Sequence, residues 1–166
     1  LNELHYAVDD AEDIRKVLIE QHNMDPDNIT LLLNDDATKD NILDALLDYF
    51  KNASSEDRII FYFAGHGQTE STVDGGELGY LVPIDIQDLD KIILQGIDMQ
   101  FLKKLTFQTH AKHILFLIDA CYGGLATVGT RSIPFKVVGD ANWHKITQGK
   151  VRKIITAGRA DEEVQE

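Results

Sequence analysis

The sequence predicts an α/β fold, a three-layer α/β/α sandwich built around a mainly parallel sheet. Short, uninterrupted apolar runs alternate along the chain with amphipathic helical patterns. Parallel strands have this uninterrupted apolar character because helices cover both faces of their sheet. With 166 residues, 43% of them hydrophobic, the chain can bury the core of one domain. We therefore expect a single domain over residues 1–166.

The first helix is predicted from apolar residues at steps of four, three and four, which share one helical face: Ala7, Ala11, Ile14 and Leu18. Pro26 ends that region, and Ile29–Leu33 has the pattern of a short buried strand. Thr38 is the predicted N-cap of a second helix. The apolar stripe of that helix consists of Ile42, Ala45, Leu46, Tyr49 and Phe50.

The middle of the chain begins with a second predicted buried strand at Ile59–Ala64, which Gly65-His66-Gly67 interrupts. Gln68–Gly79 is rich in Thr, Ser, Asp and Gly and is predicted to be a mobile loop. Tyr80–Pro83 is predicted to be a short edge or hairpin strand, because proline cannot donate to a ladder. A third helix is expected around Phe101, Leu102 and Leu105.

The last third contains a further predicted strand at Ile114–Ile118, stopped by Asp119-Ala120-Cys121-Tyr122-Gly123-Gly124. An irregular stretch follows from about Leu125 to Gly149, and Lys153–Ala157 is the last predicted strand. No internal repeat is visible.

Charge and cysteine content narrow the classes of function. The net charge of −12 disfavours nucleic acid and anionic membranes as partners. It would attract cationic peptides, although the charge alone is explained more simply by solubility. Cys121 is the only cysteine, so an internal disulfide and a cysteine-based zinc site are excluded. The sequence has no membrane-length apolar run and no signal sequence at its start, and we expect a cytoplasmic protein. Because the first residue is Leu1, the chain could also be a piece of a longer protein.

Two predicted strands end in residues that can carry chemistry, His66 and Cys121. If the strands are parallel neighbours, both residues emerge at the same edge of the sheet, as functional groups do in such folds. A nearby imidazole can generate the reactive thiolate and later protonate a leaving amine. The flanking glycines leave backbone N–H groups free for an oxyanion, and the natural donors are those of Gly67 and Cys121.

Plainer interpretations stand beside this one. A lone cysteine at a strand end is usually a small buried apolar residue, and a lone histidine is more often structural than catalytic. His144 is the only credible competitor to His66, since His110 and His113 precede their strand and belong at the opposite edge. Motifs for serine hydrolases, phosphate-binding loops and dinucleotide binding are absent, and no third ligand accompanies the two neighbouring histidines as a metal site would require.

Two motifs resemble those of a known family. Phe63-Ala64-Gly65-His66-Gly67 resembles the catalytic histidine segment of caspase-like cysteine peptidases of clan CD, and Leu117–Gly124 resembles their cysteine segment in its metacaspase or prokaryotic form. Ala7–Ala11 is similar to the metacaspase segment that opens the first helix. Ile154–Gly158, with Ala160-Asp161-Glu162, resembles the start of the small subunit.

The resemblance implies a regulated endopeptidase that acts through an acyl-enzyme thioester, with Cys121 as nucleophile and His66 as acid–base partner. In metacaspases the S1 pocket, which holds the residue before the cleaved bond, is acidic and accepts Arg or Lys. The matching positions here are Asp10 and Asp119. A buried carboxylate is costly unless a cation visits it, so we expect cleavage after Arg or Lys. For Asp10 the alternative is an ordinary acid at a helix N-terminus.

The resemblance also divides the domain into a large-subunit-like part (1–125), a processing region (126–150) and the start of a small-subunit-like part (151–166). Candidate sites of self-cleavage are Arg131, Lys136, Lys145, Lys150 and Arg152. The family's first and last strands are missing from the chain, so we expect other domains or chains to complete the sheet.

Two further departures from the family pattern bear on cofactors and activity. Tyr122 stands where eukaryotic metacaspases often have histidine. The acidic cluster of calcium-dependent members is only partly matched by Ile97–Gln100, so calcium dependence is an alternative that we do not favour. We expect no cofactor. Two alternatives of other classes remain: a caspase-like regulatory module without turnover, and a flavodoxin-like domain with an incidental cysteine.

Overall fold

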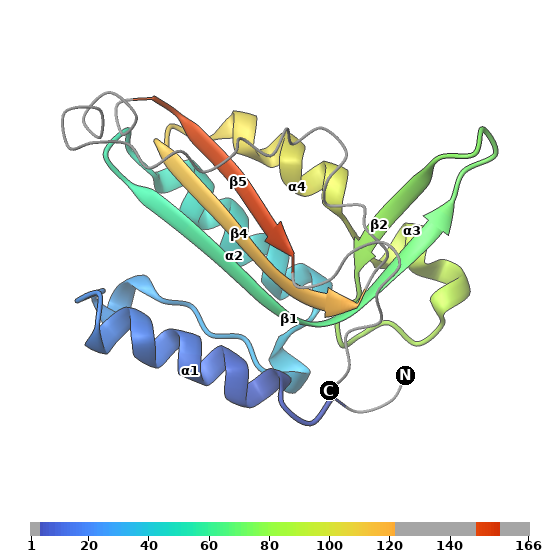
Figure 1. Ribbon diagram of the computed structural model, residues 1–166, viewed down its shortest axis with the longest axis horizontal. Helices are drawn as coiled ribbons and strands as arrows, with labels where there is room; N and C mark the ends of the chain where they lie inside the picture. The colour runs from blue at the N-terminus through green and yellow to red at the C-terminus, as the bar shows by residue number, and fades with distance from the viewer. Residues whose placement is uncertain (1–3, 122–148, 157–166) are drawn as a thin grey trace, which may run out of the picture.

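A computed structural model describes residues 4–121 and 149–156 of the chain. Its described strands form one sheet in the order β3-β2-β1-β4-β5 (Figure 1). Their bounds are Arg58–Ser71 (β1), Glu77–Leu81 (β2), Ile97–Asp98 (β3), His113–Cys121 (β4) and Val151–Thr156 (β5). β1, β4 and β5 are parallel, whereas β2 pairs antiparallel with both β1 and β3. The predicted α/β class with a largely parallel central sheet is confirmed.

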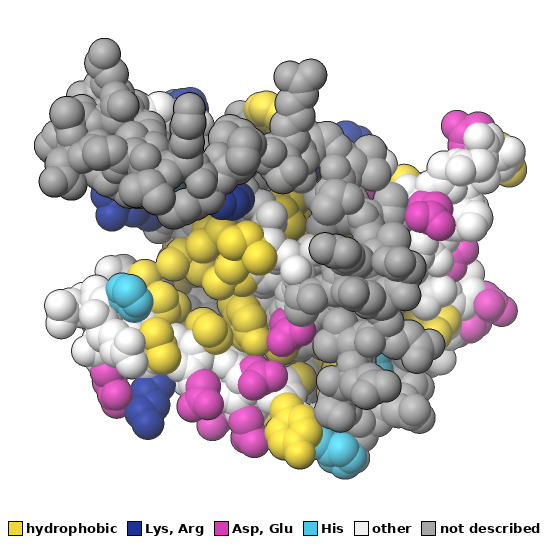
Figure 2. All heavy atoms as spheres, viewed as in Figure 1, with side chains coloured by type: hydrophobic (Ala, Val, Ile, Leu, Met, Phe, Trp, Pro, Cys, Tyr) yellow, Lys and Arg dark blue, Asp and Glu magenta, His cyan; other side chains and the backbone are white. Residues whose placement is uncertain are grey.

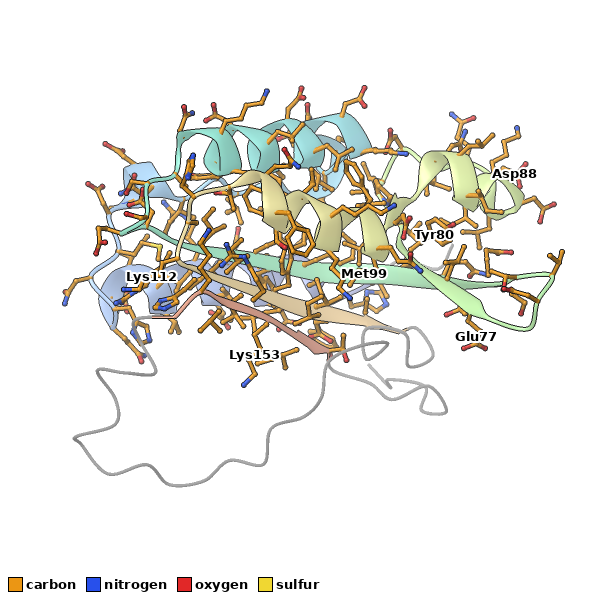
Figure 3. All side chains as sticks on the ribbon, turned by 90° about the horizontal axis from the view of Figure 1, so that it is seen from above. Glu77, Tyr80, Asp88, Met99, Lys112 and Lys153 are labelled. Carbon is orange, nitrogen blue, oxygen red and sulfur yellow. The ribbon has the colours of Figure 1, made fainter. Side chains whose placement is uncertain are left out.

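Helices cover both faces of this sheet, which confirms the three-layer sandwich. α1 (Ala7–Glu20) lies on one face, and α2 (Lys39–Asn52) lies with α4 (Met99–Leu105) on the other (Figures 1 and 3). A four-residue helix, α3 (Ile92–Gln95), and short 3-10 turns join them; the turns are Pro26–Asn28, Asn34–Asp36, Leu89–Lys91 and Thr106–Gln108. None of the helices in the described ranges has the length and apolar character needed to cross a membrane.

The core lies between the sheet and the layer of α2 and α4. Every second residue of β4 points into it: Ile114, Phe116, Ile118 and Ala120. α2 contributes Ile42, Leu46 and Phe50, all on the stripe that the sequence predicted, and α4 contributes Met99, Leu102 and Leu105. The predicted N-cap is confirmed, because the Thr38 hydroxyl accepts a hydrogen bond from the Asn41 N–H at 3.2 Å.

The strand that carries His66 is longer than predicted. β1 does not stop at Gly65-His66-Gly67 but continues to Ser71, and Gln68–Gly79 is not a mobile loop. Residues 67–71 pair with β2, and a turn closes the hairpin where the Thr72 N–H donates to the Gly76 carbonyl at 2.8 Å. The ladder of backbone hydrogen bonds overrides a composition that favours turns, because β2 offers a partner that local sequence does not reveal.

The predicted strand at Ile29–Leu33 is wrong. Both terminal residues have extended dihedral angles, but the segment pairs with no described strand and is only partly buried. A cavity of about 810 Å³ separates it from residues 58–65 of β1, whose edge opposite β4 faces no described strand. Figure 2 shows hydrophobic side chains gathered in a hollow beside α1. Because no described strand lies in this gap, the segment has no described ladder to join.

The carboxyl half differs from prediction mainly in element bounds. β4 runs on through Asp119 to Cys121, and β5 begins two residues before the predicted Lys153. The predicted Tyr80–Pro83 strand is β2, displaced toward Glu77. Sequence patterns missed α3 and β3, which are too short to show a period. The predicted irregular stretch lies almost entirely outside the described residues.

Candidate active site

His66 and Cys121 stand opposite one another on adjacent strands. The parallel register of β1 and β4 runs from Arg58 and His113 to His66 and Cys121 without a break. Neighbouring strands lie ~4.8 Å apart, so the two backbones are adjacent at this point. Cys121 is the last residue of β4, which puts the pair at the carboxyl edge of the parallel strands. The prediction that these strands are parallel neighbours is confirmed.

The backbone of His66 fixes the direction of the next amide. The Val82 N–H donates to the His66 carbonyl at 2.9 Å, so that carbonyl points toward the β2 side of β1. No described peptide bond is cis, and across a trans peptide the following N–H points the opposite way. The Gly67 N–H therefore points toward the side on which β4 ends. This orientation suits an oxyanion donor.

Asp119 precedes Cys121 by two residues on β4, so both lie on the same face of the sheet. The register partner of Asp119 on β1 is Ala64. The side chain of Asp119 is half-buried, and its register partner Ala64 has only a methyl group. No cation from the described residues forms an ion pair with Asp119. A half-buried carboxylate beside a small neighbour can receive a cationic side chain.

Asp10 lies in the first turn of α1 and is half-buried, whereas its neighbour Asp9 is exposed. The two predicted S1 carboxylates act on one phenol, that of Tyr62. Burial raises the pKa of Tyr62 to about 12, and the negative charges of Asp119 and Asp10 act in the same direction. Asp10 and Asp119 therefore share a neighbourhood, although they lie more than one hundred residues apart in sequence.

Other predicted residues lie elsewhere. His113 begins β4 and pairs with Arg58, at the opposite edge of the sheet from His66, as expected. Within the ranges that the structure describes, no group of three or more His, Cys, Asp or Glu residues could hold a metal ion. Asp98 caps α4, where its carboxylate accepts the Gln100 N–H at 2.7 Å. His144 and Tyr122 lie outside the described residues.

Some of the candidate positions for self-cleavage lie within the described residues and others lie outside them. Arg131, Lys136 and Lys145 lie outside the described residues. Lys150 is exposed just before β5. Arg152 lies inside β5, and its guanidinium donates to the carbonyls of Ala111 at 2.8 Å and Lys112 at 2.9 Å.

Sequence reasoning missed Tyr62 and Ala64 as members of this site. Both looked like ordinary core positions in an apolar strand. The available signal was strand parity: residues 62, 64 and 66 alternate onto one face of β1, the face that carries His66.

Comparisons with known proteins give matches to one family. Residues 1–163 match the family described as the caspase domain. Metacaspase-1 of Yarrowia lipolytica is 30% identical over 135 residues, which cover 75% of this chain and 29% of that protein. Metacaspase-1 of Arabidopsis thaliana is 28% identical over 133 residues, 74% of this chain and 35% of that protein. The chain thus spans about a third of the length of these relatives.

The fold has a counterpart among solved structures. The crystal structure of protein GSU0716 from Geobacter sulfurreducens superposes with a TM-score of 0.56 at 19% sequence identity. The match covers 71% of this chain and 42% of that one. At this identity the likeness concerns the fold alone.

Proposed function

This chain belongs to the caspase domain family, and from that premise we propose that it is a cysteine endopeptidase with Cys121 as nucleophile and His66 as acid–base partner. The observation that carries the proposal is the register that pairs these two residues at the carboxyl edge of the sheet. The segment around His66 already resembles the family's catalytic histidine segment, and the register supports the same choice, because it sets His66 opposite Cys121.

In the proposed mechanism, His66 takes the proton from the Cys121 thiol, and the thiolate sulfur attacks the carbonyl carbon of the substrate peptide bond. The developing oxyanion accepts hydrogen bonds from the N–H groups of Gly67 and Cys121. Protonated His66 then gives its proton to the leaving amine as the C–N bond breaks, leaving a thioester. Water, deprotonated by His66, hydrolyses the thioester and frees the thiol. The chemistry requires no cofactor.

For specificity we propose cleavage after Arg or Lys, with Arg preferred. The support is electrostatic: Asp10 and Asp119 are half-buried around one phenol, and the chain carries a net charge of −12. A guanidinium can bridge two carboxylates in bidentate fashion, while an ammonium acts as a point charge. A P1 aspartate would place a third carboxylate in the same pocket and is expected to be rejected.

Release of a fluorophore from peptides that end in Arg, Lys or Asp tests the proposal. Wild type should turn over the Arg peptide fastest, and Cys121→Ala or His66→Ala should lower kcat by at least ~10³-fold. His110→Ala is the matched control, because His110 is exposed and precedes β4 at the opposite edge. Turnover that survives in Cys121→Ala would contradict the mechanism, and preference for Asp would contradict the pocket assignment alone.

We also propose that the protein cleaves itself in the segment before β5. Lys150 is favoured among the described candidates, because it is exposed, whereas Arg152 is held inside β5 by its hydrogen bonds. Arg131, Lys136 and Lys145 remain candidates on sequence grounds. Mapping new termini after incubation tests this, with Cys121→Ala alongside. Identical fragments from both proteins would mean that another protease makes them.

Finally, we propose that further domains or chains complete the sheet and regulate activity. The support is the 810 Å³ cavity between residues Ile29–Leu33 and the edge of β1 that no described strand covers. A central strand with one unpaired edge leaves backbone donors and acceptors that a further strand would satisfy.

A further inference from the structure

The α1-facing side of β1 forms a row of three residues that leads inward from the candidate dyad. His66, Ala64 and Tyr62 occupy alternate positions and line the same cavity, together with Val8 and Ala11 of α1. At ~3.3 Å per residue, Ala64 lies one step of ~6.6 Å from His66, and Tyr62 lies a second such step inward. The direction of the row is from the reacting edge toward the interior.

The middle position of the row is the smallest. Ala64 contributes only one methyl group to the cavity that His66 and Tyr62 also line. Asp119 is the register partner of Ala64 on β4. A P1 side chain that extends from the dyad past Ala64 would therefore pass Asp119 first and meet Tyr62 at the end.

The chemistry of the phenol suits that position. Its hydroxyl stays protonated over the physiological range, since burial and the nearby charges of Asp119 and Asp10 oppose ionisation. A neutral phenol offers one O–H donor and two acceptor lone pairs. It can donate to a carboxylate and accept an N–H from a guanidinium at the same time. A phenylalanine ring at this position could do neither.

We propose that Tyr62 is a specificity-determining residue that forms the floor of the S1 pocket, where its hydroxyl contacts the guanidinium end of a P1 arginine between Asp119 and Asp10. This inference rests on the proposed function, because it names a further residue of the same pocket. A P1 lysine presents a compact ammonium group instead of the planar fork of donors of a guanidinium. A hydrogen bond to the phenol oxygen therefore adds less to the binding of lysine than to that of arginine.

Agmatine, which carries an alkyl guanidinium, tests the pocket without any turnover. In the Cys121→Ala background, agmatine should bind and shift the Tyr62 ring resonances, and Tyr62→Phe should weaken binding about tenfold, as expected for one hydrogen bond to a charged group. Tyr80→Phe is the matched control: burial and two carboxylates, Asp98 and Glu70, also raise the pKa of Tyr80, but that residue lies on β2 outside this cavity.

Equal agmatine affinity with and without the Tyr62 hydroxyl overturns the inference, and so does the absence of binding. If Tyr62→Phe fails to fold, as circular dichroism would reveal, the agmatine-induced shift of the Tyr62 resonances decides instead. In active enzyme, Tyr62→Phe should raise KM for Arg peptides about tenfold with little change in kcat, and should affect Lys peptides less. Loss of the proposed function appears separately, as wild-type turnover that does not depend on Cys121.

Discussion

For Asp10 and Asp119, a role in binding a cationic P1 side chain has to be separated from an ordinary structural role. Asp119 lies inside a strand, where a half-buried carboxylate has little structural use. Asp10 has an alternative role, because any acid in the first turn of a helix interacts favourably with the helix dipole. Its neighbour Asp9 shares that turn but is exposed, so the two acids separate the roles.

Asp10→Asn should raise KM for Arg peptides and lower kcat/KM roughly tenfold, because one charged partner of the guanidinium is lost. Asp9→Asn is the control and should leave kcat/KM unchanged. Both substitutions should lower the free energy of unfolding by a similar amount, ~0.3–1 kcal/mol, because each removes a favourable interaction with the helix dipole. Steady-state kinetics with urea unfolding of both variants gives the comparison. Equal kinetics in the two variants would favour the dipole role for Asp10.

Tyr62 also predicts a dependence of stability on pH. Its pKa is near 10 in an unfolded chain and about 12 in the fold, so between those values the folded state binds more protons. The stabilisation is fully present below pH ~10 and is lost as pH rises toward 12. Tyr62→Phe should make this alkaline decline shallower, as urea midpoints above pH 10 would show. Part of the alkaline loss of stability should remain in this variant, because the pKa of Tyr80 is also raised.

The sequence indicated the candidate dyad more clearly than it indicated the residues around it. His66 and Cys121 stood out because glycines and strand ends flank both, and Asp10 and Asp119 followed from the family resemblance. Tyr62 did not stand out, because an aromatic residue inside an apolar strand normally belongs to a core. Only the pairing of β1 with β4 and the position of α1 bring the charges of Asp119 and Asp10 close enough to raise the pKa of Tyr62, in addition to burial.

Among the elements, helices were predicted more reliably than strand ends. α2 has a cap and an apolar stripe of period 3.6, both of which are local signals. The limits of β1 are not local: residues 67–71 are extended because β2 pairs with them. The same reasoning explains Ile29–Leu33, where the apolar pattern of a strand is present but no described partner is.

The N-cap hydrogen bond of α2, between Thr38 and Asn41, can be tested by substitution. Thr38→Ala should lower the free energy of unfolding by ~1 kcal/mol, because the Asn41 N–H loses its acceptor. Thr38→Ser keeps a hydroxyl and should lose much less. Urea unfolding measures both. Since α2 supplies core residues to the sheet, a stability loss with unchanged kcat would show that the cap serves the scaffold alone.

The described part of the molecule is asymmetric about its sheet. The α2 and α4 side has a closed core, whereas α1 contains no fully buried residue and borders the large cavity. The candidate site therefore lies at the boundary between a well-packed layer and an open one. An additional strand beside β1 would bury the apolar face of α1 and steady Asp10 relative to Asp119. This is a route by which completion of the sheet could control activity.

Hydrogen exchange tests this view of the whole molecule. Amides of residues 59–65 that face the cavity should exchange rapidly in this chain alone, while those that pair with β4 are protected. In a longer chain or a complex that supplies the extra strand, the exposed set should slow by at least ~10²-fold. Amides on β4 and β5 serve as the internal control. Exchange that is already slow in the isolated chain would show that nothing is missing there.

Whether His66 acts on Cys121 can be measured directly, as the rate at which iodoacetamide labels the single thiol at pH 7 and at pH 9. An ordinary thiol ionises near pH ~8.5 and labels slowly at neutral pH. We predict rapid labelling at pH 7 in the wild type, and a strong loss of that rate in His66→Gln but not in His110→Gln. Labelling at pH 7 that is equally slow in all three proteins, or equally fast, would contradict the account.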